Sequence, residues 1–234
     1  MLASLTGGLL GLFLGMRHAL EPDHLAAIST MLTDRPGARR AAGLGAAWGL
    51  GHTAALLVVA MVLLAARAEM SPALVDAFEF VVALVLILLG ARSIHGAIRP
   101  AHHDAHADAD TDASAGALGH RHDDEPTHFH AGRFTIAGRP FLVGICHGLA
   151  GSGALTVLAL AHMPTTSGAL GYVAVFGIGS AAGMSLLSIL ACWPLARIAG
   201  SDRGRRALGL AAGGIACSLG VVWGWPMMAR LIAG

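Results

Sequence analysis

The chain is short of charge, of lysine and of paired cysteines, and each shortage excludes a class of protein. Only 12% of its 234 residues are charged and 55% are hydrophobic, whereas soluble domains carry roughly 25% charged residues. All 15 basic residues are arginines and the formal net charge is +1, so no nucleic-acid partner is expected. The composition excludes an ordinary soluble domain and favours a membrane protein.

The three cysteines lie in apolar segments without Cys-x-x-Cys spacing: Cys146, Cys192 and Cys217. Such cysteines are typical of small buried positions rather than of a disulfide framework. A membrane thiol–disulfide carrier made of two repeats needs a cysteine in each half. All three lie in the second half, so this function is kept only as an alternative.

Six apolar stretches are long enough to cross a bilayer, which takes roughly 20 residues each. They cover 2–31, 41–66, 73–95, 140–162, 168–196 and 207–230. The first is longer than one span needs and contains Pro22, so we expect it to be broken. It also leads without a cleavage site into charged residues, which indicates a retained span rather than a signal peptide. The sequence therefore predicts an all-α membrane protein with six transmembrane helices.

The arginines predict the orientation of these helices. Eleven belong to the loops after the first, third and fifth spans and Arg92 lies near the end of the third span, against Arg67 and Arg230 on the other side. Arginine-rich loops face the cytoplasm, so both termini should face outward, in a multi-pass protein of the inner (plasma) membrane. The twelve are Arg35, Arg39, Arg40, Arg92, Arg99, Arg121, Arg133, Arg139, Arg197, Arg203, Arg205 and Arg206.

The loop over 97–139 differs in kind from the rest of the chain. Its histidines are interleaved with aspartates and it has almost no apolar residue before Phe129, so it should be disordered without a ligand. Histidine-rich tracts often bind metal; the alternative is a solvated linker. The candidate ligands are His102, His103, His106, His120, His122, His128 and His130.

Two pairs of short segments indicate an internal repeat. Residues 15–20 match residues 144–149 in a Gly-x-x-His-small-Leu pattern, and residues 49–54 match residues 177–182. The offsets are 129 and 128 residues, which are nearly equal.

The repeat divides the chain into two transmembrane units, residues 1–96 and 140–234, joined by the loop over 97–139. Each unit contains an odd number of spans, so the second should insert upside down relative to the first. Such 3+3 inverted repeats are typical of secondary transporters, whose substrate sites lie at broken helices near the midplane.

Five ionisable residues fall between Arg17 and His24, inside the apolar first stretch. Ionisable side chains in hydrocarbon are costly and mark functional sites. A continuous helix would point His18, Asp23 and His24 in different directions. A break at Pro22 lets them turn toward one ion, and this ligand set suits nickel, cobalt or zinc. The alternative is a helix that ends at Pro22, with its charges at the membrane interface.

Two further histidines are candidates for the same site. His52 follows Gly49 and Gly51 near the middle of the second span, where glycines allow a neighbouring backbone to approach. The alternative for His52 is a hydrogen bond to a neighbour without a metal role. His147, the repeat mate of His18, is a further candidate. We also expect Arg17 and Glu21 to form an ion pair one helical turn apart.

The segment from His18 to His24 resembles the His-x-x-x-x-Asp-His signature of the nickel/cobalt transporter (NiCoT) family, and 51–53 resembles its second motif. The resemblance is closer to the six-span branch of NicO-like, urease-accessory membrane proteins, which also shows a segment similar to 147–155. It implies that His18, Asp23, His24 and His52 are needed for metal selection and transport.

These observations predict transmembrane transport of Ni²⁺ or Co²⁺ as substrate, with no enzymatic activity and no permanently bound cofactor. Uptake would supply urease or hydrogenase maturation; the alternative is efflux for metal resistance, since histidine-rich loops also occur in exporters of the wider superfamily. The 97–139 loop would act as a metal reservoir, a sensor or a hand-off site to a cytoplasmic metallochaperone. In a further alternative, the loop only buffers metal and the spans anchor it.

Overall fold

The computed structural model describes residues 2–32, 37–99, 138–151 and 165–233. This part of the chain is helical throughout and contains no strand, which confirms the all-helical prediction. Its helices are α1 (Leu2–His18), α2 (Pro22–Met31), α3 (Ala38–Ala66), α4 (Pro72–Ile98), a helix over 138–151, α6 (Thr166–Ile198) and α7 (Asp202–Ala233). The histidine-rich loop lies outside the described residues.

Four of the described helices are long and apolar enough to cross a membrane: α3, α4, α6 and α7. They correspond to the second, third, fifth and sixth predicted spans. The first predicted span is two helices of 17 and 10 residues, α1 and α2. The fourth is described only as far as residue 151. The chain is therefore a multi-pass membrane protein.

The break in the first span lies where Pro22 was expected to cause it. α1 ends at His18 and α2 begins at Pro22, because proline has no N–H for the helical ladder and crowds the preceding turn. Glu21 is extended, with φ −63° and ψ 147°, and caps α2. Its N–H donates to the carbonyl of His18 at 3.0 Å. The two helices are thus joined by a tight turn.

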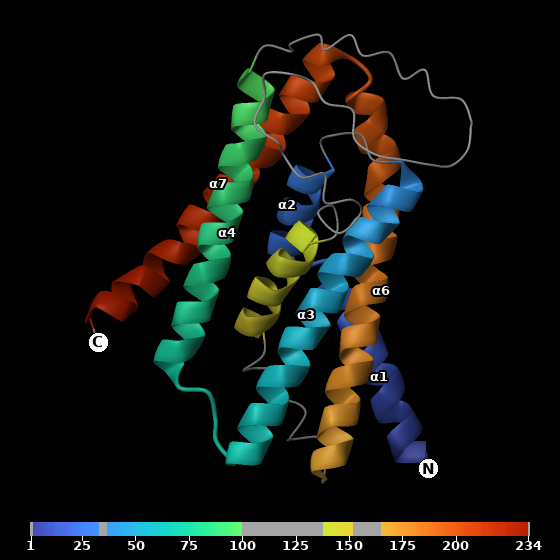
Figure 1. The fold of residues 1–234 in the computed structure, drawn as a ribbon, viewed down its shortest axis with the longest axis vertical. Coiled ribbons are helices and arrows are strands. Elements are labelled where there is room, and N and C mark those ends of the chain that lie inside the picture. The colour runs from blue at the N-terminus through green and yellow to red at the C-terminus, as the bar shows by residue number, and fades with distance from the viewer. Residues whose placement is uncertain (1, 33–36, 100–137, 152–164, 234) are drawn as a thin grey trace, which may run out of the picture.

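The long helices pack in pairs. α3 lies along α6 and α4 lies along α7, while α1 packs on α6 and α2 contacts both α4 and α7. In Figure 1 the short α2 and the 138–151 helix lie between these longer helices. At the break, Ala19 and His24 are buried in the bundle, whereas Leu20, Glu21 and Pro22 are exposed.

The polarity of the packing is that of a membrane protein. Large apolar side chains face outward from every long helix, for example Phe13, Leu50, Leu88 and Trp193. Buried positions include a group of polar side chains. These are His24, Thr30, His52, His147, Ser180 and Ser188. Apolar surface of this extent fits lipid.

Glycines let two pairs of helices approach closely, as small residues do at helix crossings in membranes. The Phe176 carbonyl occupies the place where a side chain on Gly15 would begin, and the Trp48 carbonyl occupies that place at Gly144. Gly15 and Gly144 hold the same position in the first pair of matching segments, and Trp48 and Phe176 each directly precede a segment of the second pair. Equivalent residues thus make equivalent contacts, α1 with α6 and the 138–151 helix with α3.

Candidate metal centre

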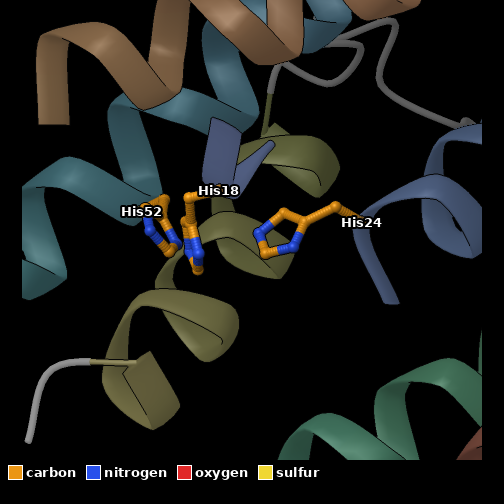
Figure 2. Close-up of side chains that lie close together, drawn as sticks. All are labelled: His18, His24 and His52. Atoms are coloured by element: carbon orange, nitrogen blue, oxygen red, sulfur yellow. The ribbon is translucent and has the colours of Figure 1, made fainter. Parts of the chain in front are cut away.

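Three histidines converge at the break between α1 and α2 (Figure 2). His18 is the last residue of α1, His24 lies in the first turn of α2, and His52 lies in α3. The ring of His18 is 4.7 Å from that of His24 and 5.0 Å from that of His52, between centroids. One ring nitrogen from each histidine lies within 4.8 Å of the others. The three imidazoles are close enough to hold one ion after small side-chain movements.

Local structure explains how these residues meet. The turn before Pro22 redirects the chain, so that His18 and His24 face each other instead of pointing apart along one helix. His52 comes near His18 because α3 and α1 both pack on α6. The 138–151 helix crosses α3 at Gly144 and Gly148, where His52 backbone atoms leave no room for a larger residue. The site depends on one proline and on glycine crossings.

The ring nitrogens at the centre lack partners. His24 and His52 are almost completely buried, and neither Nε2 of His24 nor either nitrogen of His52 has a hydrogen bond. A buried polar atom without a partner costs about 1–3 kcal/mol, and such atoms are rare in native structures. A bound cation would satisfy these nitrogens, so the arrangement fits a metal ion.

Two carboxylates contact the rings from outside the three-imidazole group. Oε1 of Glu21 lies 2.8 Å from Nδ1 of His18, and Oδ1 of Asp23 lies 3.0 Å from Nδ1 of His24. The Glu21 side chain is 52% exposed, whereas that of Asp23 is 13% exposed. Glu21, Asp23 and His24 also form a second group with metal-ligand spacing. The site therefore carries negative charge beside its imidazoles.

The expected ion pair between Arg17 and Glu21 is wrong. Glu21 contacts His18 instead, and Arg17 is exposed. Residues four apart meet only on a continuous helix, and α1 ends at His18 before that turn is complete. The break that creates the site also separates this pair.

His147, in the 138–151 helix, lies beside Asp23 and His24. Its Nδ1 donates to the carbonyl of Val143 at 3.0 Å, since a carbonyl oxygen can only accept. Its Nε2 is 3.9 Å from Oδ2 of Asp23 and has no hydrogen bond. Its ring centroid is 5.3 Å from that of His24. The structure thus places His147 next to the site, through Asp23 and His24.

Trp48 is part of the site although the sequence analysis did not identify it. Its ring stacks on His24 at 5.2 Å with an interplanar angle of 17°, and its edge meets His147 at 5.4 Å. Trp48 precedes His52 by one helical turn, and residues at that spacing share a helix face. This spacing in the sequence could have identified Trp48 as a neighbour of the site. The indole walls the site on the side of α3.

The structure brings together His18, Asp23, His24, His52 and His147. The seven loop histidines from His102 to His130 lie outside the described residues. The ligand roles of both groups stay predictions.

Two comparisons with known proteins found matches to this chain. The family profile described as high-affinity nickel-transport protein (NicO) matches residues 5–193, a range that contains every residue gathered at the break. The chain is also similar to the urease accessory protein UreH of Bacillus sp. (strain TB-90). The two are 31% identical over 179 residues, which cover 75% of this chain and 71% of that protein. No solved structure matches the chain significantly.

Proposed function

The chain belongs to the NicO family of high-affinity nickel-transport proteins, and from that premise we propose that it carries Ni²⁺ across the membrane through the three-imidazole group. The observation that carries the proposal is the convergence of His18, His24 and His52 at a helix break, with buried ring nitrogens that have no partner. Broken backbone at membrane depth is tolerated where it lines a cavity or is buried in protein.

The chemistry of the group suits this substrate. Imidazole is a good ligand for Ni²⁺, Co²⁺ and Zn²⁺, and Asp23 supplies a negative charge that offsets part of the charge of a divalent ion. The ion is the substrate and not a resident cofactor. Binding needs neutral imidazoles, so the bound state depends on pH in the range where histidine titrates. Co²⁺ has the same ligand preferences and is the second candidate substrate.

We further propose that residues 1–96 and 140–234 form a 3+3 inverted repeat joined by the 97–139 loop. The equivalent contacts of Gly15 and Gly144 support this arrangement, because the matching segments pack in matching ways. The arginine bias supports a cytoplasmic loop and outward-facing termini. The loop would then present its histidines to the cytoplasm, where a metallochaperone is the proposed partner.

The proposed direction is uptake. The relative named as a urease accessory protein supports a role in supplying nickel for urease, and the NicO description supports high-affinity capture. Efflux, the alternative suggested by the histidine-rich loop, is not favoured by these comparisons. The transporter family also supports a role without catalysis.

Nickel accumulation in cells tests the proposal. Cells that express the full chain should accumulate more ⁶³Ni than cells with an empty vector, and His52→Ala should reduce accumulation to the vector level because one of three ligands is lost. His95→Ala, at an exposed histidine near the end of α4, is the matched control and should accumulate nickel like the wild type.

Membrane abundance of all three proteins must be equal, as measured by immunoblot of the membrane fraction. Wild-type accumulation by the His52→Ala protein would overturn the proposed site. Less nickel in wild-type cells than in vector cells would reverse the proposed direction and indicate efflux.

A further inference from the structure

The two carboxylates of the site have an arrangement that bears on how the ion is held. Resting on the proposed nickel transport, we infer that Glu21 and Asp23 are positioning residues that act from behind the imidazoles, rather than ligands of the ion. Each holds Nδ1 of one histidine, so that the opposite nitrogen, Nε2, faces the centre. The ion would then be bound by His18, His24 and His52.

The contacts of the two carboxylates show which ring nitrogen of each histidine is paired. An ionised carboxylate can only accept a hydrogen bond, so Nδ1 of His24 donates to Oδ1 of Asp23 at 3.0 Å. Nδ1 of His18 lies 2.8 Å from Oε1 of Glu21, so the same nitrogen of this ring is paired with a carboxylate. In a neutral imidazole with a proton on Nδ1, the lone pair is on Nε2. The carboxylates therefore set which nitrogen of each ring is free to bind metal.

The surroundings of His24 leave one of its ring nitrogens without a partner. Its Nε2 is buried and has no hydrogen bond, while its Nδ1 is occupied by Asp23. Stacking on Trp48 fixes the plane of the ring. The ring is thus held on one edge and one face, and Nε2 is the atom left to meet an ion.

Asp23 lies close to more than one imidazole. Its two oxygens point to two different imidazoles, Oδ1 to His24 at 3.0 Å and Oδ2 to His147 at 3.9 Å. The three-imidazole group has metal-ligand spacing without Asp23. Asp23 is thus placed between two rings, at the edge of the group.

This arrangement has a chemical consequence. Metal-binding histidines commonly donate their other N–H to a carboxylate, which orients the ring and makes it a stronger ligand. Here the ion would contact neutral nitrogens, and the negative charge would lie one ring away. Transport requires binding that is favourable enough to capture an ion and weak enough to release it. Outer carboxylates strengthen the imidazole ligands without adding a charged atom to those bound to the ion.

Asparagine and alanine at position 23 separate the two roles of Asp23. The side-chain oxygen of asparagine can still accept from Nδ1 of His24, whereas alanine cannot. If Asp23 acts from behind, Asp23→Asn should weaken Ni²⁺ binding by about tenfold and Asp23→Ala by about a hundredfold, the range known for such partners. Binding is measured by equilibrium dialysis of NiCl₂ against the purified full chain in nanodiscs.

The visible absorption of bound Co²⁺ is the second readout, because it reports the atoms bound to the metal. The Co²⁺ bands should be the same in the wild type, Asp23→Asn and Glu21→Gln, and should change in His52→Ala. Glu79→Gln, a carboxyl on α4 outside the site, is the matched control and should leave affinity and bands unchanged. Size-exclusion profiles check that each variant is folded.

Four results would overturn the inference. Equal loss of affinity in Asp23→Asn and Asp23→Ala, or altered Co²⁺ bands in Asp23→Asn, would make Asp23 a ligand. Altered bands in Glu21→Gln would favour an ion held by the group of Glu21, Asp23 and His24. A wild-type protein that binds neither Ni²⁺ nor Co²⁺ would overturn the proposed function itself, and the inference with it.

Discussion

Glycines allow close helix packing both at the centre of the bundle and between α4 and α7. The two regions differ in whether their polar groups have hydrogen-bond partners. Both use glycine: a Cβ on Gly90 of α4 would lie 2.6 Å from the Gly213 carbonyl of α7, much as Gly144 meets Trp48. In the α4–α7 pair the polar groups satisfy one another. Ser93 donates to the Gly209 carbonyl at 3.0 Å, and Arg230 makes two hydrogen bonds to Asp76, at 2.7 and 2.9 Å.

At the centre, by contrast, buried nitrogens of His24, His52 and His147 have no partner. Unsatisfied buried groups lower stability, and strained or costly groups cluster at functional sites. Close packing alone therefore does not identify the site. The site is marked by polar atoms that the protein buries without satisfying.

A fall in pH should affect the metal centre much more than the α4–α7 pair. Metal binding needs deprotonated imidazole nitrogens, so metal affinity depends on pH. Nickel affinity should therefore fall as the solution is made more acidic, because protons compete with the ion for the imidazole nitrogens. The contact between Asp76 of α4 and Arg230 of α7 contains no histidine. We therefore expect this contact to persist when nickel affinity falls. Dialysis at a series of pH values measures the loss, and pH-independent affinity would argue against imidazole ligands.

Alanine at the two kinds of glycine crossing should distinguish binding from packing. Gly144→Ala forces a methyl group against the Trp48 carbonyl, and overpacking of this kind costs about 1–3 kcal/mol. Because Trp48 and His52 line the site, Gly144→Ala should also weaken nickel binding. Gly90→Ala should lower thermal stability and leave nickel affinity unchanged.

Gly171→Ala is the control for these two variants, because nothing lies near a Cβ at that position of α6. It should change neither thermal stability in detergent, beyond a small gain in helix propensity, nor nickel affinity. Equal nickel affinity in Gly144→Ala and Gly90→Ala would remove the link between the central crossing and the site.

The smallest effect is expected from the ion pair at the ends of α4 and α7. Asp76→Asn removes the charge that pairs with Arg230, and exposed ion pairs contribute little to stability. The melting temperature should fall only slightly and nickel affinity should not change. A large loss of affinity would show that this pair is coupled to the centre. Thermal unfolding and dialysis on the same preparation measure both quantities.

Much of the fold could be predicted because it depends on local sequence. The second predicted span, 41–66, agrees with α3 (Ala38–Ala66) at its C-terminal end, since hydrophobic length alone defines such a helix. The break at Pro22 followed from the missing proline N–H. The partner of Glu21 was predicted incorrectly, because the helical spacing used to pair it with Arg17 does not survive that break.

The amino-acid sequence by itself determined which residue types lie in apolar surroundings and where the first span breaks, because both depend on neighbours along the chain. Only the tertiary structure decided that His18, His24 and His52 meet, that Trp48 covers His24, and that a carboxylate contacts Nδ1 of both His18 and His24. These contacts join α1, α2, α3 and the 138–151 helix. Their geometry depends on how closely the helices cross, which is set by glycines far apart in the sequence.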